Sequence, residues 1–104
     1  MDLHDYQKRV IPFRIYPSEA EVTYPAMGLA GEVGELLNKL KKTTRDGVPY
    51  DTEALRSEIG DCLWYLAALA ADLGISIDVA AERNLAKLED RKQRNKLQGN
   101  GDNR

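Results

Sequence analysis

The chain has little of what several common protein classes need. Its 104 residues include one cysteine, Cys62, and one histidine, His4. A single cysteine cannot form an intramolecular disulfide, and a single histidine excludes a di-iron site built from two Glu-x-x-His motifs. No apolar run reaches the 18 residues typical of a membrane-spanning helix, and the N-terminus lacks a basic and apolar signal pattern. We therefore expect a cytoplasmic protein with no membrane partner.

An excess of positive charge is also absent. Fifteen Lys and Arg residues stand against 17 Asp and Glu residues, so the net charge is −2. Proteins that bind a nucleic-acid polymer usually carry a basic surface, and this balance argues against such a partner. A small phosphorylated ligand fits it better. With 42% hydrophobic and 31% charged residues, the sequence indicates one soluble domain that is short for a core of its own.

Apolar residues recur at steps of three and four over most of the chain, which predicts an all-α fold. We expect helices over about 2–10, 25–42 and 51–73, and a fourth that begins at Ser76 with a buried line of Ile77, Ala81, Leu85 and Leu88. The segment 12–23 is expected to be a connector whose aromatic residues cover the core or wall a nucleobase, and 43–50 a loop. Residues 1–97 would form one helical domain of about four helices, and 98–104 a polar tail. Dimerisation would complete the bundle.

Two pairs of acidic residues have helical spacing: Glu32 with Glu35, and Glu58 with Asp61. Each pair shares one helix face, and packing the two faces together would bring four carboxylates into one place. Unit charges about 5 Å apart repel by roughly 3 kcal/mol at an effective dielectric near 20. Oxygen ligands without Cys or His suit Mg²⁺ or Mn²⁺, which would offset this repulsion. The alternative is that both acidic faces are simply solvated.

Glycine recurs every third residue beside the first acid pair, at Gly28, Gly31 and Gly34. Each glycine inside a helix costs up to about 1 kcal/mol relative to alanine. Three on one stripe therefore indicate that another helix or a ligand approaches closely.

Three runs of the sequence resemble the MazG-type nucleoside triphosphate pyrophosphohydrolases: 28–35, 58–66 and 84–91. The ending 99–104 is similar to that of short, single-domain MazG-like proteins. The resemblance implies an all-α fold that forms dimers or dimers of dimers and binds Mg²⁺ through ExxE and ExxD carboxylates. It also implies hydrolysis of a nucleoside triphosphate to its monophosphate and pyrophosphate, in pool sanitation or nucleotide supply.

The resemblance also implies roles for the acidic residues. Glu32, Glu35, Glu58 and Asp61 would be the metal ligands, with Glu32 or Glu35 as the catalytic base. The sequence departs from the fuller family motif at Gly31, where that motif has another Glu. One ligand or base of the fuller motif is therefore missing.

A second set of residues is expected to bind the substrate. Tyr65 lies one helical turn beyond the ExxD acids, where its ring would contact the base or sugar. An amide, an ammonium and a guanidinium share one face of the fourth helix at Asn84, Lys87 and Arg91, which suits phosphate oxygens. Arg104, at the end of a glycine-hinged tail, would close over a bound triphosphate. The competing interpretations are a packed Tyr65, a solvated basic face and a frayed tail.

Two other functions stay open on the sequence. A non-catalytic helical dimerisation or adaptor module would carry the same acids as a solvated surface and show no functional response to metal. A phosphohydrolase that cuts a different bond, or acts on modified or alarmone nucleotides, would share the metal site and differ in its products.

Overall fold

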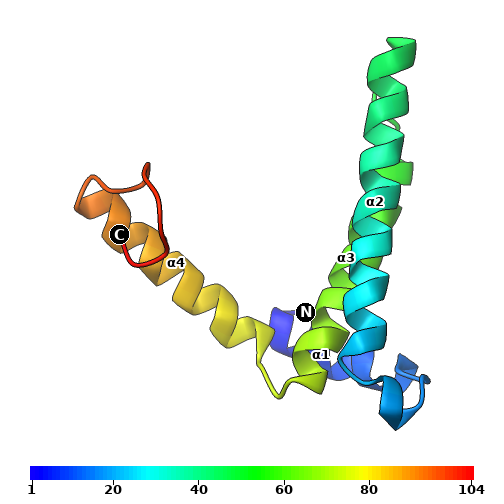
Figure 1. Ribbon diagram of the computed structural model, residues 1–104, viewed down its shortest axis with the longest axis horizontal. Coiled ribbons are helices and arrows are strands. Elements are labelled where there is room, and N and C mark those ends of the chain that lie inside the picture. The colour runs from blue at the N-terminus through cyan, green and yellow to red at the C-terminus, as the bar shows by residue number, and fades with distance from the viewer.

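The computed structural model describes residues 1–104 as an all-α chain without strands, which confirms the predicted fold class (Figure 1). Two 3₁₀ turns follow the first helix and lie in the connector. The elements in chain order are α1 (Leu3–Val10), η1 (Ile11–Phe13), η2 (Ser18–Ala20), α2 (Thr23–Asp46), α3 (Thr52–Asp72) and α4 (Ile77–Gln93).

Local side-chain chemistry sets most helix ends where the sequence predicts them. Asp2, Asp51 and Ser76 each accept a hydrogen bond from the backbone amide three residues on, at 2.8, 3.2 and 3.2 Å. These caps satisfy amides that have no partner within the helix. Gly47 and Gly74 follow α2 and α3 with φ of 65° and 71°, a left-handed conformation that glycine adopts without strain.

The predicted limits of α2 are wrong at both ends. The helix runs from Thr23 to Asp46 rather than over 25–42, so the first part of the expected loop is helical. Pro25 is the third residue of the helix, where its missing amide hydrogen breaks no intrahelical bond. No residue between Lys42 and Gly47 disrupts a helix, and α2 therefore continues until the left-handed glycine ends it.

Helices α2 and α3 form a long antiparallel pair, and α1 packs across the C-terminal end of α3 (Figure 1). The small core lies at this crossing and consists of Val10, Ala67 and Ala68, with Tyr6 and Trp64 packed against it. The two alanines are 0% exposed. Small side chains at these positions let α1 approach α3 closely.

Helix α4 leaves the other helices at a bend of 102° from α3, so that the chain has an open V shape (Figure 1). Its radius of gyration is 16.7 Å, against about 13 Å for a compact domain of 100 residues. Only seven of 104 residues are buried. The chain is therefore an open arrangement of helices with a small core.

The bend also corrects the expected burial of α4. Leu85 and Leu88 were predicted to lie in its buried line, yet their exposed fractions are 59% and 37%. Leu66 and Leu73 on α3 are also about half exposed, at 47% and 52%. The apolar spacing predicted these faces correctly as apolar, but no other part of the same chain covers them.

No helix of the chain is by itself both long and apolar enough to cross a membrane; the bent pair of α3 and α4 passes the same criteria of length and composition when taken together.

Candidate active site

The α2–α3 pair brings three of the four predicted acids together. Glu32 on α2 and Glu58 and Asp61 on α3 each place one carboxylate oxygen within 4.8 Å of the others. These three residues are called the acid cluster below. Glu35 lies one turn further along α2, is exposed, and stands outside the cluster.

A lysine neutralises part of this charge. The Lys39 ammonium lies 2.8 Å from Glu58 Oε1, across the contact between the two helices. This hydrogen bond lowers the pKa of Glu58. Burial raises the pKa of Glu32, and the nearby Glu58 and Asp61 carboxylates raise it further. Two carboxylates in one site thus have pKa values shifted in opposite directions.

The chemistry of the acid cluster fits a divalent cation. The second carboxylate oxygen of Glu58, Oε2, is buried and has no hydrogen-bond partner. A buried acceptor without a partner costs about 1–3 kcal/mol, so this atom favours a ligand that binds it. Mg²⁺ and Mn²⁺ prefer such carboxylate oxygens. Glu32, Glu58 and Asp61 are the residues that would hold the ion.

An aromatic pocket adjoins the acid cluster. Tyr65 lies one turn beyond Asp61, and Gly28 lies one turn before Glu32. A Cβ atom at Gly28 would be 2.2 Å from Tyr65 Cε1, so the glycine is what lets the Tyr65 ring pack onto α2. The pocket has a volume of about 240 Å³ and is lined by Phe13, Ile15, Tyr16, Pro17, Tyr24, Trp64 and Tyr65.

The predicted phosphate-binding residues do not meet the acid cluster within one chain. Asn84, Lys87 and Arg91 lie on α4, which extends away from the α2–α3 pair (Figure 1). Asn84 is exposed, whereas the Arg91 side chain is only 6% exposed. Because the bend after α3 separates them, one chain does not place α4 beside the acid-bearing helices. A site between these elements stays a prediction that would need α4 of a second chain.

The tail folds back on α4 instead of fraying. Asp102 Oδ1 lies 2.7 Å from the Lys87 ammonium and 3.2 Å from the Arg91 guanidinium. Arg104 donates to backbone carbonyl oxygens of Lys96, Leu97 and Gly101, at 3.2, 2.9 and 2.6 Å. In this conformation all the bonds of Arg104 are to the tail and the end of α4.

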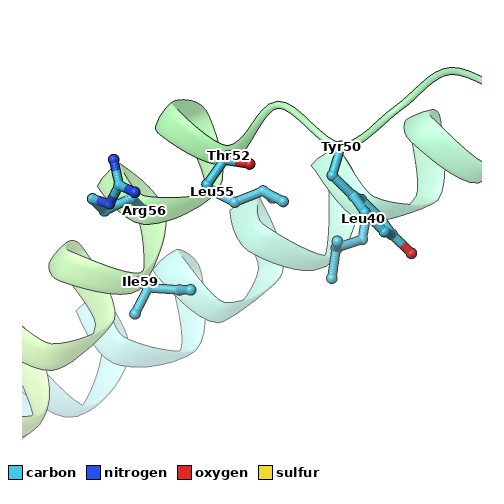
Figure 2. A pocket seen from close by; sticks show the side chains of 6 residues that line it. All are labelled: Leu40, Tyr50, Thr52, Leu55, Arg56 and Ile59. Carbon is cyan, nitrogen blue, oxygen red and sulfur yellow. The ribbon is translucent and has the colours of Figure 1, made fainter.

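A second pocket lies between the C-terminal part of α2 and the start of α3 (Figure 2). Its volume is about 440 Å³, and Leu40, Tyr50, Leu55 and Ile59 supply its apolar wall. It contains no carboxylate, histidine or cysteine, so it offers no metal-binding chemistry. Ile59 is 57% exposed there, which suits a protein contact better than a polar ligand.

Comparison with known proteins identifies the family. A family model for the MazG nucleotide pyrophosphohydrolase domain matches residues 23–95, which include both helices of the acid cluster and α4. The chain belongs to the MazG family. This MazG-family chain is 40% identical over 114 residues to the Gene 37 protein of Mycobacterium phage L5, with 100% of both chains covered. No solved structure matches it significantly. Members of this family are nucleotide pyrophosphohydrolases, and the family is typically metal-dependent.

Proposed function

We propose that this MazG-family protein is a Mg²⁺-dependent hydrolase that cleaves a nucleoside triphosphate to the monophosphate and pyrophosphate. Its acid cluster carries the proposal: three carboxylates from two helices meet, and one of their oxygens is buried without a partner. A solvated acidic surface would leave each carboxylate bound to water. Mn²⁺ would also suit these ligands.

The acidic residues have two roles in the proposed hydrolysis, metal binding and activation of water. When bound, Mg²⁺ would neutralise phosphate charge and lower the pKa of a water molecule. Glu32, Glu58 and Asp61 hold the ion, and Lys39 keeps Glu58 in place by bonding its other oxygen. Glu35 is exposed one turn from Glu32 and outside the cluster, so its carboxylate is free to orient water and accept a proton from it.

The aromatic pocket takes the base of the nucleotide. Its lining contains no charged side chain, which suits a neutral planar ring and not a phosphate group. Its volume of about 240 Å³ is below the 300–1,000 Å³ typical of pockets for drug-sized ligands, so it has room for one ring system. The sugar and phosphates would then extend from Tyr65 toward the acid cluster.

A second copy of the chain supplies the phosphate-binding residues. Within one chain α4 points away from the acid cluster, and its apolar face and that of α3 are exposed. Pairing two chains as a homodimer, or as a dimer of dimers, would cover these faces. It would also bring Asn84, Lys87 and Arg91 of one chain to the acids of the other. Arg91 and Lys87 would bind phosphate oxygens once Asp102 is displaced.

The test is a panel of nucleoside triphosphates with Mg²⁺, with products resolved by chromatography. The expected products are a monophosphate and pyrophosphate, and turnover should be lost in Asp61→Asn and Glu35→Gln. Glu53→Gln is the matched control, because this carboxylate is on α3 but 82% exposed and outside the cluster. Diphosphate and phosphate as products would instead identify a phosphohydrolase that cuts another bond. No turnover by a stable dimer would favour the adaptor function.

A further inference from the structure

One buried carboxylate joins the connector to the end of α3. Asp72 is the last residue of α3, and its side chain is 0% exposed. It accepts hydrogen bonds from the Tyr16 hydroxyl at 2.8 Å and the Val22 amide at 2.9 Å, and it pairs with the Arg14 guanidinium. All three donors come from residues 14–22. A buried charge is stable only with such partners, so Asp72 fixes the path of the connector.

One of these bonds holds a strained turn. Val22 has φ of 67° and ψ of −57°, and the Thr23 amide donates to the Glu21 carbonyl at 2.7 Å. This is the γ-turn with positive φ, which is rare for any residue and especially unfavourable for a β-branched one. Such a conformation persists only where the surroundings hold it. Here the Val22 amide is held by Asp72, directly before α2 begins.

The connector and this turn place two walls of the aromatic pocket. Tyr16 stacks on Tyr24 with ring centroids 4.8 Å apart and an angle of 26° between planes. Tyr24 is the second residue of α2 and lies 6.4 Å from the Tyr65 ring. The hydroxyl of Tyr16 is bonded to Asp72, so its ring is held at its hydroxyl end as well as by the stack on Tyr24. Asp72 thereby determines where one wall stands relative to Tyr65.

We propose that Asp72 is a positioning residue for nucleotide binding: it holds Tyr16 and the start of α2 so that the aromatic pocket is formed before the base enters. This rests on the proposed function, in which the base occupies that pocket. The competing explanation is that Asp72 stabilises the fold and nothing more. The two explanations predict different effects of changing Asp72. A positioning role weakens binding of the base and leaves binding of the phosphates unchanged, whereas a general loss of structure weakens both.

Trp64 is an intrinsic fluorescent probe for this test. Trp64 is the only tryptophan, it lines the pocket, and its ring meets Tyr65 edge to face at 5.1 Å. Nucleoside monophosphates are titrated with Mg²⁺ present, and Trp64 fluorescence is followed. In Asp72→Asn we expect the Kd of the best-bound monophosphate to rise at least five-fold. The inhibition constant of inorganic pyrophosphate, which has no base, should stay within two-fold of the wild-type value.

Turnover gives a second measurement. For a nucleoside triphosphate, Asp72→Asn should raise KM at least five-fold and leave kcat within two-fold. Asp90→Asn is the matched control: it removes one carboxylate from an exposed pair with Arg94 and should change neither constant. If Asp72→Asn does not fold, Arg14→Gln serves instead: it changes neither Asp72 nor any aromatic residue of the pocket, but it removes one of the bonds that tie the connector to α3, and Kd and KM should rise in the same direction.

The outcomes separate this inference from the proposed function. A folded variant at Asp72 or Arg14 that keeps the wild-type Kd and KM overturns the positioning role, even if the wild-type protein hydrolyses triphosphates. An equal rise in the constants for monophosphate and pyrophosphate also overturns it, because a general loss of structure would produce that pattern. The wild-type protein could bind monophosphates, as followed by Trp64 fluorescence, without hydrolysing triphosphates. The proposed function then fails, and the change in Kd still decides the positioning role.

Discussion

The Lys39 ammonium bonds Glu58 on the facing helix, at 2.8 Å, and not Glu35 one turn away on its own helix. The acid cluster therefore has a positively charged side chain beside it. This one side chain offsets part of the repulsion between three carboxylates and holds one of them in a fixed orientation. The other oxygen of Glu58 is left buried and unpartnered.

Replacing Lys39 by methionine, which keeps the aliphatic stem, tests this balance. We expect a lower Tm without metal, because the carboxylates then repel one another without compensation. The rise in Tm on adding Mg²⁺ should be larger than in the wild-type protein, since the ion becomes the only nearby positive charge. Thermal unfolding with and without Mg²⁺ measures both, with Lys42→Met on the same helix as control. Equal Mg²⁺ responses in the two variants would contradict the expectation.

The glycine stripe predicts opposite effects at two positions. Gly28→Ala would place a methyl group against Tyr65, at 2.2 Å from Cε1 before relaxation. Overpacking of this kind typically costs about 1–3 kcal/mol. Gly34→Ala meets nothing within 4 Å and should gain up to about 1 kcal/mol from helix propensity. Urea unfolding measures both. A loss of stability at Gly34 would mean that a second chain packs closely there.

Tyr16 makes stability depend on pH above neutrality. Burial raises its pKa to about 12 from an ordinary 10.0, and the bond to Asp72 adds to the shift. Because the folded state holds this proton more tightly, its contribution to stability is complete below pH 10 and is lost as the pH rises through 12. The free-energy difference between the wild-type protein and Tyr16→Phe should therefore shrink from pH 9 to pH 12. A difference that is constant over this range in urea unfolding would refute this prediction.

The proposed sharing of the site between two chains is testable by complementation. Asp61→Asn inactivates the acid cluster, and Lys87→Ala inactivates the phosphate-binding face of α4. Each variant alone should be inactive. Random pairing makes half of the dimers mixed, with one intact site of two, so the mixture should regain about a quarter of wild-type activity. The two variants are unfolded and refolded together, and light scattering at low micromolar concentration checks that a dimer forms. No recovery of activity in such a dimer would place the site within one chain.

Asp102 forms ion pairs with Lys87 and Arg91, the two side chains that are proposed to bind phosphate. In Asp102→Asn, the amide competes less well with a triphosphate for Lys87 and Arg91, and we expect KM to fall several-fold. Asp90→Asn, on the same helix, is the control. A several-fold rise in KM would instead support the tail as a lid that closes over the substrate. Deletion of residues 99–104 should lower the Tm, because it removes Asp102, the partner of the Arg91 guanidinium.

Most of the secondary structure could be predicted because it depends on local chemistry. Asp2, Asp51 and Ser76 cap their helices through the amide three residues on, and the two left-handed glycines end α2 and α3. The pairing of Glu32 with the ExxD acids also follows from spacing, once two helices are assumed to pack. The end of α2 was missed because its last residues tolerate both helix and loop.

What the sequence could not reveal depends on contacts between distant residues. Nothing in the spacing of Lys39 indicates that it bonds Glu58 on another helix. Asp72 was missed for the same reason, although a signal exists: an acid in the last turn of a helix is unfavourable to the helix dipole and so indicates partners elsewhere. Spacing of the apolar residues of α4 shows which face is apolar, but not which chain covers it.

One side chain of α1 bonds the backbone of the bend between α3 and α4. The Gln7 side-chain amide donates to the Ile75 carbonyl at 2.8 Å, and its oxygen accepts from the Ile77 amide at 3.1 Å. The four residues between α3 and α4 are long enough for a tight reversal, since helix hairpins are closed by loops of two to eight residues. The length of the connection therefore does not by itself set the bend. The bonds from Gln7 and the packing of Ile77 against the small core both hold the start of α4 in place. Because Gln7 belongs to α1, the first helix of the chain helps to fix the direction in which the last helix leaves the α2–α3 pair.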